Sequence, residues 1–454
     1  MYNILEKQKE FFKSGKTLDV NFRIEYLKNL KTVIKVYEKE IFNALYKDLG
    51  KSETEAYMCE IGLTLDEISY MIKNIKKFAK EKIVKTPITH FYSQSKIKLV
   101  PRGNVLIMSP WNYPFLLSLE PLIDAISAGN TAIVKPSAYS PATSEIVSKI
   151  IKEVFPEEYV AVVTGGREEN KELLSYKYDY IFFTGSTNIG KEVLKKASDH
   201  LTPTTLELGG KSPCIVDKDI NLSLTAKRIV FGKFLNCGQT CVAPDYILCH
   251  KEIKNSLINE IKKEIKKQFG ENPLENKNYG KIINEKHFNR VKNLINFEKT
   301  IHGGKTNPET LKIEPTVLTD ITWTDNVMQE EIFGPILPIL TYENLDEVIE
   351  TIENHPHPLA LYMFSNNKKH IKKIMDNCRF GGGCINDVIV HLATSEMPFG
   401  GFGESGMGSY HGKFGFETFS HKRSILDKKT WLDLPMRYQP YKKIYNTLLR
   451  FFLK

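Results

Sequence analysis

The chain has 454 residues, of which 41% are hydrophobic and 26% charged, with a formal net charge of +9. These proportions are typical of a soluble globular protein, and the length predicts two or three domains. The positive charge does not indicate a nucleic-acid partner, because the lysines alternate with glutamates along helical segments and no RNA- or DNA-binding motif accompanies them. Seven cysteines without disulfide-framework spacing favour a reducing compartment.

The two ends of the chain bear on its location. The N-terminal residues MYNILEKQKEFFKSGK mix charged and apolar side chains and lack a signal-peptide core. No apolar run approaches the ~18 residues that span a bilayer, so we expect a cytoplasmic protein without a transmembrane span. The short basic and apolar segment 441–454 fits packing on a partner subunit, which we favour, or weak contact with a membrane surface.

Residues 1–80 are predicted to be helical, because apolar residues recur at helical spacing in Lys/Glu-rich stretches. Residues 83–103 show alternation and predict an extended excursion or a bridging hairpin. Between 104 and 206, short apolar runs alternate with helical stretches, which predicts parallel βαβ units in a doubly wound sheet. The predicted strands are Val105–Met108, Ala132–Val134, Val160–Val163 and Ile181–Phe183, and the predicted helices are Phe115–Ala128, Pro141–Phe155 and Glu168–Tyr176.

A second alternating region extends from about 207 to 395, with predicted strands and helices at Ile336–Leu340, Leu345–Glu353, Leu359–Phe364 and Lys368–Asn377. The segment 399–408 is too rich in glycine for a helix or a central strand. The fold class is therefore α/β, with a nucleotide-binding architecture in the first region, where ligands bind at the carboxyl ends of the strands.

A thiol and a carboxylate suggest nucleophilic acyl chemistry. Cys241 lies in the segment NCGQTCVAP, and Glu207 lies upstream between two leucines and before two glycines. A thiol can be loaded covalently, and a buried carboxylate with a raised pKa can activate water. The alternatives are a cysteine that only packs and a glutamate in a salt bridge with a lysine. Cys237 has no such partner and is assigned to packing.

Two segments predict an anion site. Gly185, Ser186 and Gly190 lie at a predicted strand-to-helix turn, where main-chain N–H groups suit a diphosphate, although an ordinary capped helix shows the same pattern. Lys135 ends a predicted strand before a proline, so its cation points into the same crevice, unless it is a surface lysine.

Two further segments carry polar and aromatic residues after predicted strands. Asn112 and Tyr113 lie between two prolines in SPWNYPF, so the Asn112 amide is a candidate oxyanion donor or a simple turn residue. Glu331 and Phe333 offer a carboxylate for ribose hydroxyls and an aromatic wall for a nicotinamide. No metal site is expected, because the spacing of Cys237 and Cys241 has no second pair of ligands.

Together and in this order, these segments resemble the aldehyde dehydrogenase superfamily over nearly the whole chain. The short N-terminus and the run EMPFGGFGESGMGSYHGK, residues 396–413, resemble its class 3 branch of fatty and aromatic aldehyde dehydrogenases. The resemblance implies an aldehyde substrate, a cytosolic or membrane-associated protein and a homodimer.

The resemblance also implies roles for individual residues. Cys241 matches the nucleophile, Glu207 the base that activates water, and Asn112 with the Cys241 N–H the oxyanion hole. Tyr113 matches a residue of the substrate entrance. The positions that match cofactor contacts are Lys135, Gly185, Ser186, Gly190, Glu331 and Phe333.

The expected domains follow from these assignments. We expect an NAD(P)-binding domain in 1–82 and 104–206 and a catalytic domain in 207–395. Bridging or oligomerisation segments are expected at 83–103 and 396–430, followed by a tail, 431–454.

One departure from the family concerns the cofactor. Ala138 stands where many NAD-preferring relatives have a glutamate that holds the adenosine ribose, so we expect use of both NAD and NADP.

The alternatives to hydrolytic aldehyde oxidation are a CoA-acylating or reductive relative, which commonly lacks a base like Glu207, and a catalytically silent structural homologue.

Overall fold

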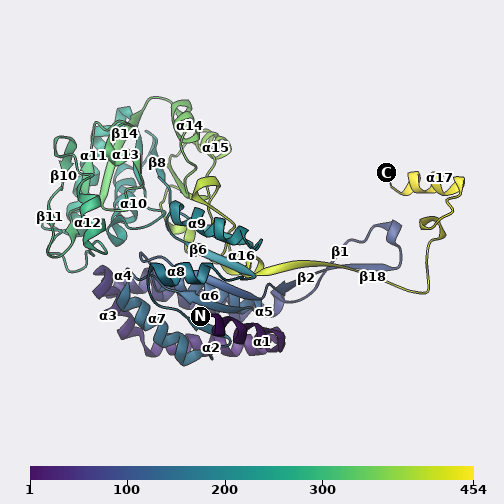
Figure 1. The fold of residues 1–454 in the computed structure, drawn as a ribbon. Helices are drawn as coiled ribbons and strands as arrows, with labels where there is room; N and C mark the ends of the chain where they lie inside the picture. Colours follow the sequence, from purple (N-terminus) through teal and green to yellow (C-terminus); the bar gives the residue numbers. More distant parts are fainter. Residues whose placement is uncertain (454) are drawn as a thin grey trace.

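Two sheets flanked by helices and one extended three-stranded sheet organise residues 1–453, the part of the chain that the computed structural model describes (Figure 1). The α/β class predicted from the sequence is confirmed. The N-terminal helices lie beneath the first sheet, and the C-terminal segment extends far from the main body (Figure 1).

The first sheet has the strand order β17-β7-β6-β3-β4-β5 and is parallel except for its two-residue edge strand β17. Its strands are β3 (Asn104–Met108), β4 (Thr131–Lys135), β5 (Val160–Val162), β6 (Tyr180–Thr184), β7 (Thr204–Glu207) and β17 (Gly406–Met407). Its connecting helices are α6 (Leu116–Ala128), α7 (Pro141–Val154), α8 (Arg167–Leu174) and α9 (Thr187–Ser198). The central strands β3 and β4 are buried along their whole length, because helices cover both faces of the sheet. The elements predicted between 104 and 183 agree with these to within two residues at each end.

Five helices precede the first sheet in the chain: α1 (Tyr2–Lys13), α2 (Val20–Val36), α3 (Glu38–Leu49), α4 (Glu53–Ala56) and α5 (Gly62–Phe78). The helix α2 packs on α5, α6 and α7, so these helices cover one face of the sheet. A π-helical turn, Tyr57–Ile61, joins α4 to α5. The short helix α16 (Gly412–Thr418) returns from the far end of the chain to pack on α5 and α6.

The second sheet has the strand order β10-β13-β14-β9-β8-β15-β16 and is parallel except at β10. Its strands are β8 (Pro213–Val216), β9 (Tyr246–His250), β10 (Thr300–His302), β13 (Thr316–Leu318), β14 (Ile336–Tyr342), β15 (Ala360–Phe364) and β16 (Gly382–Ile385). Its helices are α10 (Leu222–Phe234), α11 (Lys254–Phe269), α12 (Glu285–Lys292), α13 (Asn326–Gln329), α14 (Leu345–Glu353) and α15 (Lys368–Asn377). A small hairpin, β11 (Thr306–Asn307) and β12 (Lys312–Ile313), lies beside it.

The third sheet is an arm with the strand order β1-β2-β18 (Figure 1). Its strands are β1 (Lys82–Val84), β2 (Ser93–Pro101) and β18 (Ser420–Lys428). The antiparallel pairing of β2 with β18 extends along nine residues, so segments more than 300 positions apart in the chain lie side by side. The final helix, α17 (Lys443–Phe452), has no buried residue. Within residues 1–453, no helix combines the length and the apolar character that crossing a bilayer requires.

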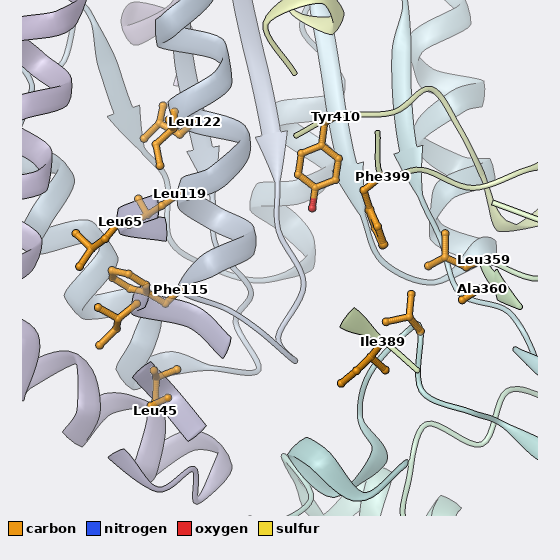
Figure 2. Close-up of a cluster of buried hydrophobic side chains, with 14 of the residues drawn as sticks. Leu45, Leu65, Phe115, Leu119, Leu122, Leu359, Ala360, Ile389, Phe399 and Tyr410 are labelled. Atoms are coloured by element: carbon orange, nitrogen blue, oxygen red, sulfur yellow. The ribbon is translucent and has the colours of Figure 1, made fainter. Parts of the chain in front are cut away.

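The largest hydrophobic core joins the two main sheets. Leu65, Phe115 and Leu119 contribute from the N-terminal side, while Leu359 and Ile389 contribute from the second sheet and its loops (Figure 2). Because side chains from both sides belong to one buried cluster, the sheets meet at a fixed interface.

Candidate active site

The loop after α10 is built from three consecutive left-handed residues. Asn236, Cys237 and Gly238 have φ angles of 50°, 53° and 73°. Glycine is required at 238, because a Cβ there would lie 2.3 Å from the main-chain oxygen of Gly334. This reversal ends the helix and directs residues 239–242 back toward the first sheet.

Cys241 is half-buried and lines a cavity of about 180 Å³ between the two main sheets. Burial, together with the carboxyl groups of Glu331 and Glu207, raises the pKa of its thiol to about 12. The N–H groups of Cys241 and Val242 act in the opposite direction. The sulfur is therefore a protonated thiol at neutral pH, and its use as a nucleophile requires a proton acceptor.

Glu207 is the last residue of β7 and lines the same cavity. Its side chain is 2% exposed, and neither carboxylate oxygen has a hydrogen-bond partner within residues 1–453. Burial raises the pKa of this carboxyl well above its ordinary value. The alternative of a salt bridge with a lysine is therefore wrong, and the group has the environment of a general base or acid.

Asn112 is buried in the turn that follows β3. Its Nδ2 donates to the main-chain oxygen of Gln239 at 3.1 Å, which places it beside the loop of Cys241. Its own main-chain oxygen accepts from Nζ of Lys51 (3.0 Å) and from Nδ2 of Asn236 (2.8 Å). The amide has a second N–H that makes no bond to the described residues. Asn112 thus stabilises the turn through these bonds and keeps one side-chain N–H free to donate to a ligand.

The cavity wall is predominantly apolar. Tyr113 lines it and is fixed by a 2.6 Å hydrogen bond between its hydroxyl and Oγ1 of Thr240. Phe399 lies between Tyr410 and Leu359 (Figure 2), and the ring of Tyr410 packs on Phe182 of β6 at a centroid distance of 5.0 Å. Further apolar lining residues include Met58, Leu63, Leu116, Leu117, Phe231, Leu235, Ile389, Val390 and Leu392. Such a wall suits an apolar ligand whose reactive end reaches the sulfur.

Lys135 ends β4 and is only 3% exposed, so the alternative of a surface lysine is wrong. Its Nζ donates to the main-chain oxygens of Gly165 (2.7 Å) and Pro136 (2.9 Å). Burial lowers the pKa of the ammonium group. The side chain is thus held as a fixed donor at the carboxyl end of its strand.

The turn between β6 and α9 brings three further predicted residues together. The Gly185 N–H donates to the main-chain oxygen of Glu207 at 3.0 Å. Ser186 occupies the N-cap of α9, but its side chain makes no capping bond. Gly190 lies against Leu208, where a Cβ would be 2.6 Å from a methyl carbon. The uncapped first turn of α9 therefore offers main-chain N–H groups beside the strand that carries the carboxylate.

Glu331 and Phe333 follow α13. The Glu331 carboxylate lies on the main chain of Gly209, whose Cβ would be 2.0 Å from Oε2. Burial raises the pKa of Glu331 to about 8, and Asp245 adds to the shift. Phe333 has a φ of 45°, and its ring packs edge-on against Trp111 at a centroid distance of 5.3 Å. Both residues are thus close to the turns that carry the other predicted contacts.

The residues present fit a dinucleotide. Ser109 and Thr184 follow or end the adjacent strands β3 and β6, and their hydroxyls are buried without a hydrogen-bond partner within residues 1–453. Together with the ammonium of Lys135 and the uncapped α9, these hydroxyls supply donors for a ligand rich in phosphate and hydroxyl groups.

Sequence reasoning missed a polar group in the cavity wall. Glu67 from α5, Glu120 from α6 and His411 line the cavity, and Asp124 of α6 lies behind them next to Glu67 and Glu120. Oε2 of Glu67 accepts from Oγ of Ser395 (2.7 Å), and Nε2 of His411 lies 3.3 Å from Glu120. Burial raises the pKa of all three carboxyls. Two acids four residues apart in an otherwise apolar helix were the available signal.

Comparison with known proteins identifies the family to which the chain belongs. A sequence profile of the Aldehyde dehydrogenase family matches residues 2–425. The chain is 47% identical to the 4,4'-diaponeurosporen-aldehyde dehydrogenase of Staphylococcus aureus, with 99% of each chain covered. It is 45% identical to the dimeric NADP-preferring aldehyde dehydrogenase of Canis lupus familiaris, covering 96% of this chain and 97% of that one.

A solved structure shows the same fold. The substrate-bound state of Staphylococcus aureus AldH superposes with a TM-score of 0.98 at 46% identity and covers 99% of both chains. This chain belongs to the aldehyde dehydrogenase family. It is an enzyme that oxidises aldehydes, as the sequence predicted, and its similarity to family 3 members confirms the resemblance to the class 3 branch.

Proposed function

We propose that Cys241, Glu207 and Asn112 carry out the oxidation of an aldehyde to its carboxylic acid, with NAD or NADP as the oxidant. The observation that supports this assignment is that the thiol and an unpaired buried carboxyl line one cavity. The CoA-acylating, reductive and catalytically silent alternatives are not favoured, because this carboxyl is present and forms no ion pair within residues 1–453.

The first step forms a bond between the Cys241 sulfur and the aldehyde carbon. The thiol proton leaves to solvent, and the carbonyl oxygen becomes an oxyanion. The spare N–H of Asn112 and the Cys241 N–H donate to this oxygen, which lowers the energy of the tetrahedral adduct. The product of the step is a thiohemiacetal.

In the second step the adduct loses a hydride and becomes a thioester of Cys241. When bound, the nicotinamide cofactor supplies the site that accepts this hydride. The residues proposed to hold the cofactor are Lys135, Gly185, Ser186, Gly190, Glu331 and Phe333. In the third step Glu207 takes a proton from water, and the hydroxide oxygen attacks the thioester carbon. The C–S bond then breaks to release the acid, and the proton held by Glu207 passes to the leaving sulfur, which restores the thiol and the carboxylate.

The substrate class follows from the cavity. Its apolar lining has the character that medium- or long-chain aliphatic and aromatic aldehydes require, with Tyr113 at the Thr240 side of the entrance. We expect octanal and NAD⁺ without CoA to give NADH and octanoate in equimolar amounts, measured by absorbance at ~340 nm and by chromatography. Failure to form NADH unless CoA is added would favour the acylating alternative.

We expect the enzyme to use both cofactors. Ala138 leaves no carboxylate at the position where NAD-preferring relatives hold the ribose, so a 2′-phosphate meets no repulsion there. The kcat/KM values for NAD⁺ and NADP⁺ should differ by less than about 100-fold, or about 3 kcal/mol. A preference of a thousandfold for NAD⁺ would contradict this expectation, and Ala138→Glu should shift the ratio toward NAD⁺.

The remaining assignments concern organisation. We propose the NAD(P)-binding domain as 1–82 and 104–206, the catalytic domain as 207–395 and the bridging segments as 83–103 and 396–430. The exposed arm and the unpacked α17 within 431–454 support a homodimer in which these segments contact the partner. The free cysteines support a cytoplasmic location. Light scattering should give twice the mass of the chain, and a monomer would contradict this proposal.

A further inference from the structure

A buried ion pair lies directly behind the turn that carries Asn112. The side chains of Lys51 and Glu60 are both fully buried, with Nζ 2.5 Å from Oε1. Lys51 lies in the loop between α3 and α4, and Glu60 lies on the π-helical turn before α5, a type of turn that is frequent at functional sites. Neither side chain is among those that line the cavity of Cys241.

The ion pair holds both ends of one short segment. Lys51 Nζ donates to the main-chain oxygen of Asn112 at 3.0 Å and lies 4.0 Å from the ring centroid of Tyr113. Glu60 Oε2 accepts from the two N–H groups that open α6, at 2.8 and 3.2 Å. The segment from the oxyanion donor to the start of the helix is thus tied to one pair of charges.

The same network extends to the loop of the nucleophile. Glu55, one turn before Glu60, accepts from the main-chain N–H of Asn236 at 2.9 Å. The side chain of Asn236 in turn donates to the main-chain oxygens of Asn112 (2.8 Å) and Gln239 (3.1 Å). Three polar residues from α4 and its neighbouring turns therefore fix the relative position of the two loops that meet at the reacting atoms.

Stability alone does not account for this pair. Burying two charges is costly, and apolar side chains of similar volume commonly serve a core equally well. Burial raises the pKa of Glu60, and the ammonium of Lys51 and the N–H groups of α6 oppose that shift. Unlike apolar groups, the two charges form directional hydrogen bonds to the main chain. Such bonds fix the position of a donor to within a fraction of an ångström.

We propose that Lys51 and Glu60 are positioning residues for aldehyde oxidation, which hold the Asn112 amide at the place where it donates to the oxyanion. This inference rests on the role of Asn112 proposed above. The pair acts through the turn and touches neither substrate nor the reacting sulfur.

The test is a double-mutant cycle at saturating cofactor. Asn112→Ala should lower kcat by about 10²- to 10³-fold. The combined variant Lys51→Met/Glu60→Gln removes both charges of the pair together, so neither partner is left alone, and it should lower kcat by about 10- to 100-fold. Introduced into Asn112→Ala, the same pair of changes should lower kcat by less than about threefold, because the donor that it positions is already absent. Cofactor affinity, measured by fluorescence titration, should be unchanged.

Asp48 provides a matched control. Its buried carboxylate accepts from the N–H groups of Ala142 (3.2 Å) and Thr143 (2.7 Å) at the start of α7, as Glu60 does at α6. Asp48→Asn should lower the melting temperature with kcat within threefold of wild type. If the ion-pair variant lowers kcat by the same factor in wild type and in Asn112→Ala, or does not lower it at all, the positioning role is overturned. The proposed role of Asn112 as oxyanion donor would not be affected by either result. A normal kcat for Asn112→Ala would instead refute the proposed oxyanion donor.

Discussion

Replacing Cys241 by alanine is expected to lower kcat for aldehyde oxidation by at least about 10⁴-fold, because the proposed covalent adduct forms on its sulfur. Cys59 also lines the cavity, but it lies on the π-helical turn before α5, whereas Cys241 lies on the loop whose N–H groups are proposed to stabilise the adduct. Binding of NAD⁺, followed by fluorescence, should be retained, since the proposed cofactor contacts lie on other segments. Turnover within tenfold of wild type would contradict the assignment.

Cys237 offers a matched control for this variant. It lies four residues earlier in the same loop, is 2% exposed and belongs to the core of the second sheet. Burial raises the pKa of its thiol above the ordinary range. Cys237→Ala should therefore retain kcat to within a few-fold and lose about 1–2 kcal/mol of unfolding free energy from the space left behind. Alkylation by iodoacetamide should inactivate this control variant at the wild-type rate.

The elements that could be predicted from sequence are those with a local signal. The strands from β3 to β6 are continuous apolar runs between helices with a clear period, and their bounds agree closely with the structure. The burial of Glu207 was also predictable, because its neighbours are leucines and glycines. The roles of the site residues were assigned by resemblance, and the structure adds that the two reactive groups share a cavity.

The features that could not be predicted depend on distant contacts. Lys51 and Asn112 are 61 positions apart, and nothing in the charged N-terminal helices distinguishes this lysine from its exposed neighbours. The pairing of β2 with β18 depends on main-chain bonds between segments whose alternation alone admits several partners. An acidic residue inside a largely apolar helix, such as Asp124 in α6, is a local pattern from which the buried group of acids could have been predicted.

Glu207→Gln is expected to separate the two halves of the reaction. Glutamine has nearly the same shape but cannot take a proton from water, so the Cys241 thioester should form and then persist. We expect a burst of about one NADH per subunit, followed by a steady state lowered by about 10²- to 10⁴-fold. Mass spectrometry of the quenched enzyme should show the acyl group on the peptide that contains Cys241. A steady state equal to wild type would refute the role of this carboxyl.

The pH dependence and stability of this variant carry independent information. Because burial raises the pKa of Glu207, the fraction in the carboxylate form, and hence the hydrolytic rate of wild type, should rise with pH through that raised pKa. The glutamine variant should lose this dependence.

The stability of the variant is a second observable. A carboxyl whose pKa is raised on folding opposes folding once the pH exceeds the pKa of the unfolded state. Glu207→Gln should therefore not lower the melting temperature at neutral pH. By contrast, Glu264→Gln, at a buried carboxylate of α11 paired with Lys267, should leave the burst, the steady state and their pH dependence unchanged. A parallel loss in both variants would show that removing any buried carboxylate slows hydrolysis, and Glu207 would then lose its place as the base.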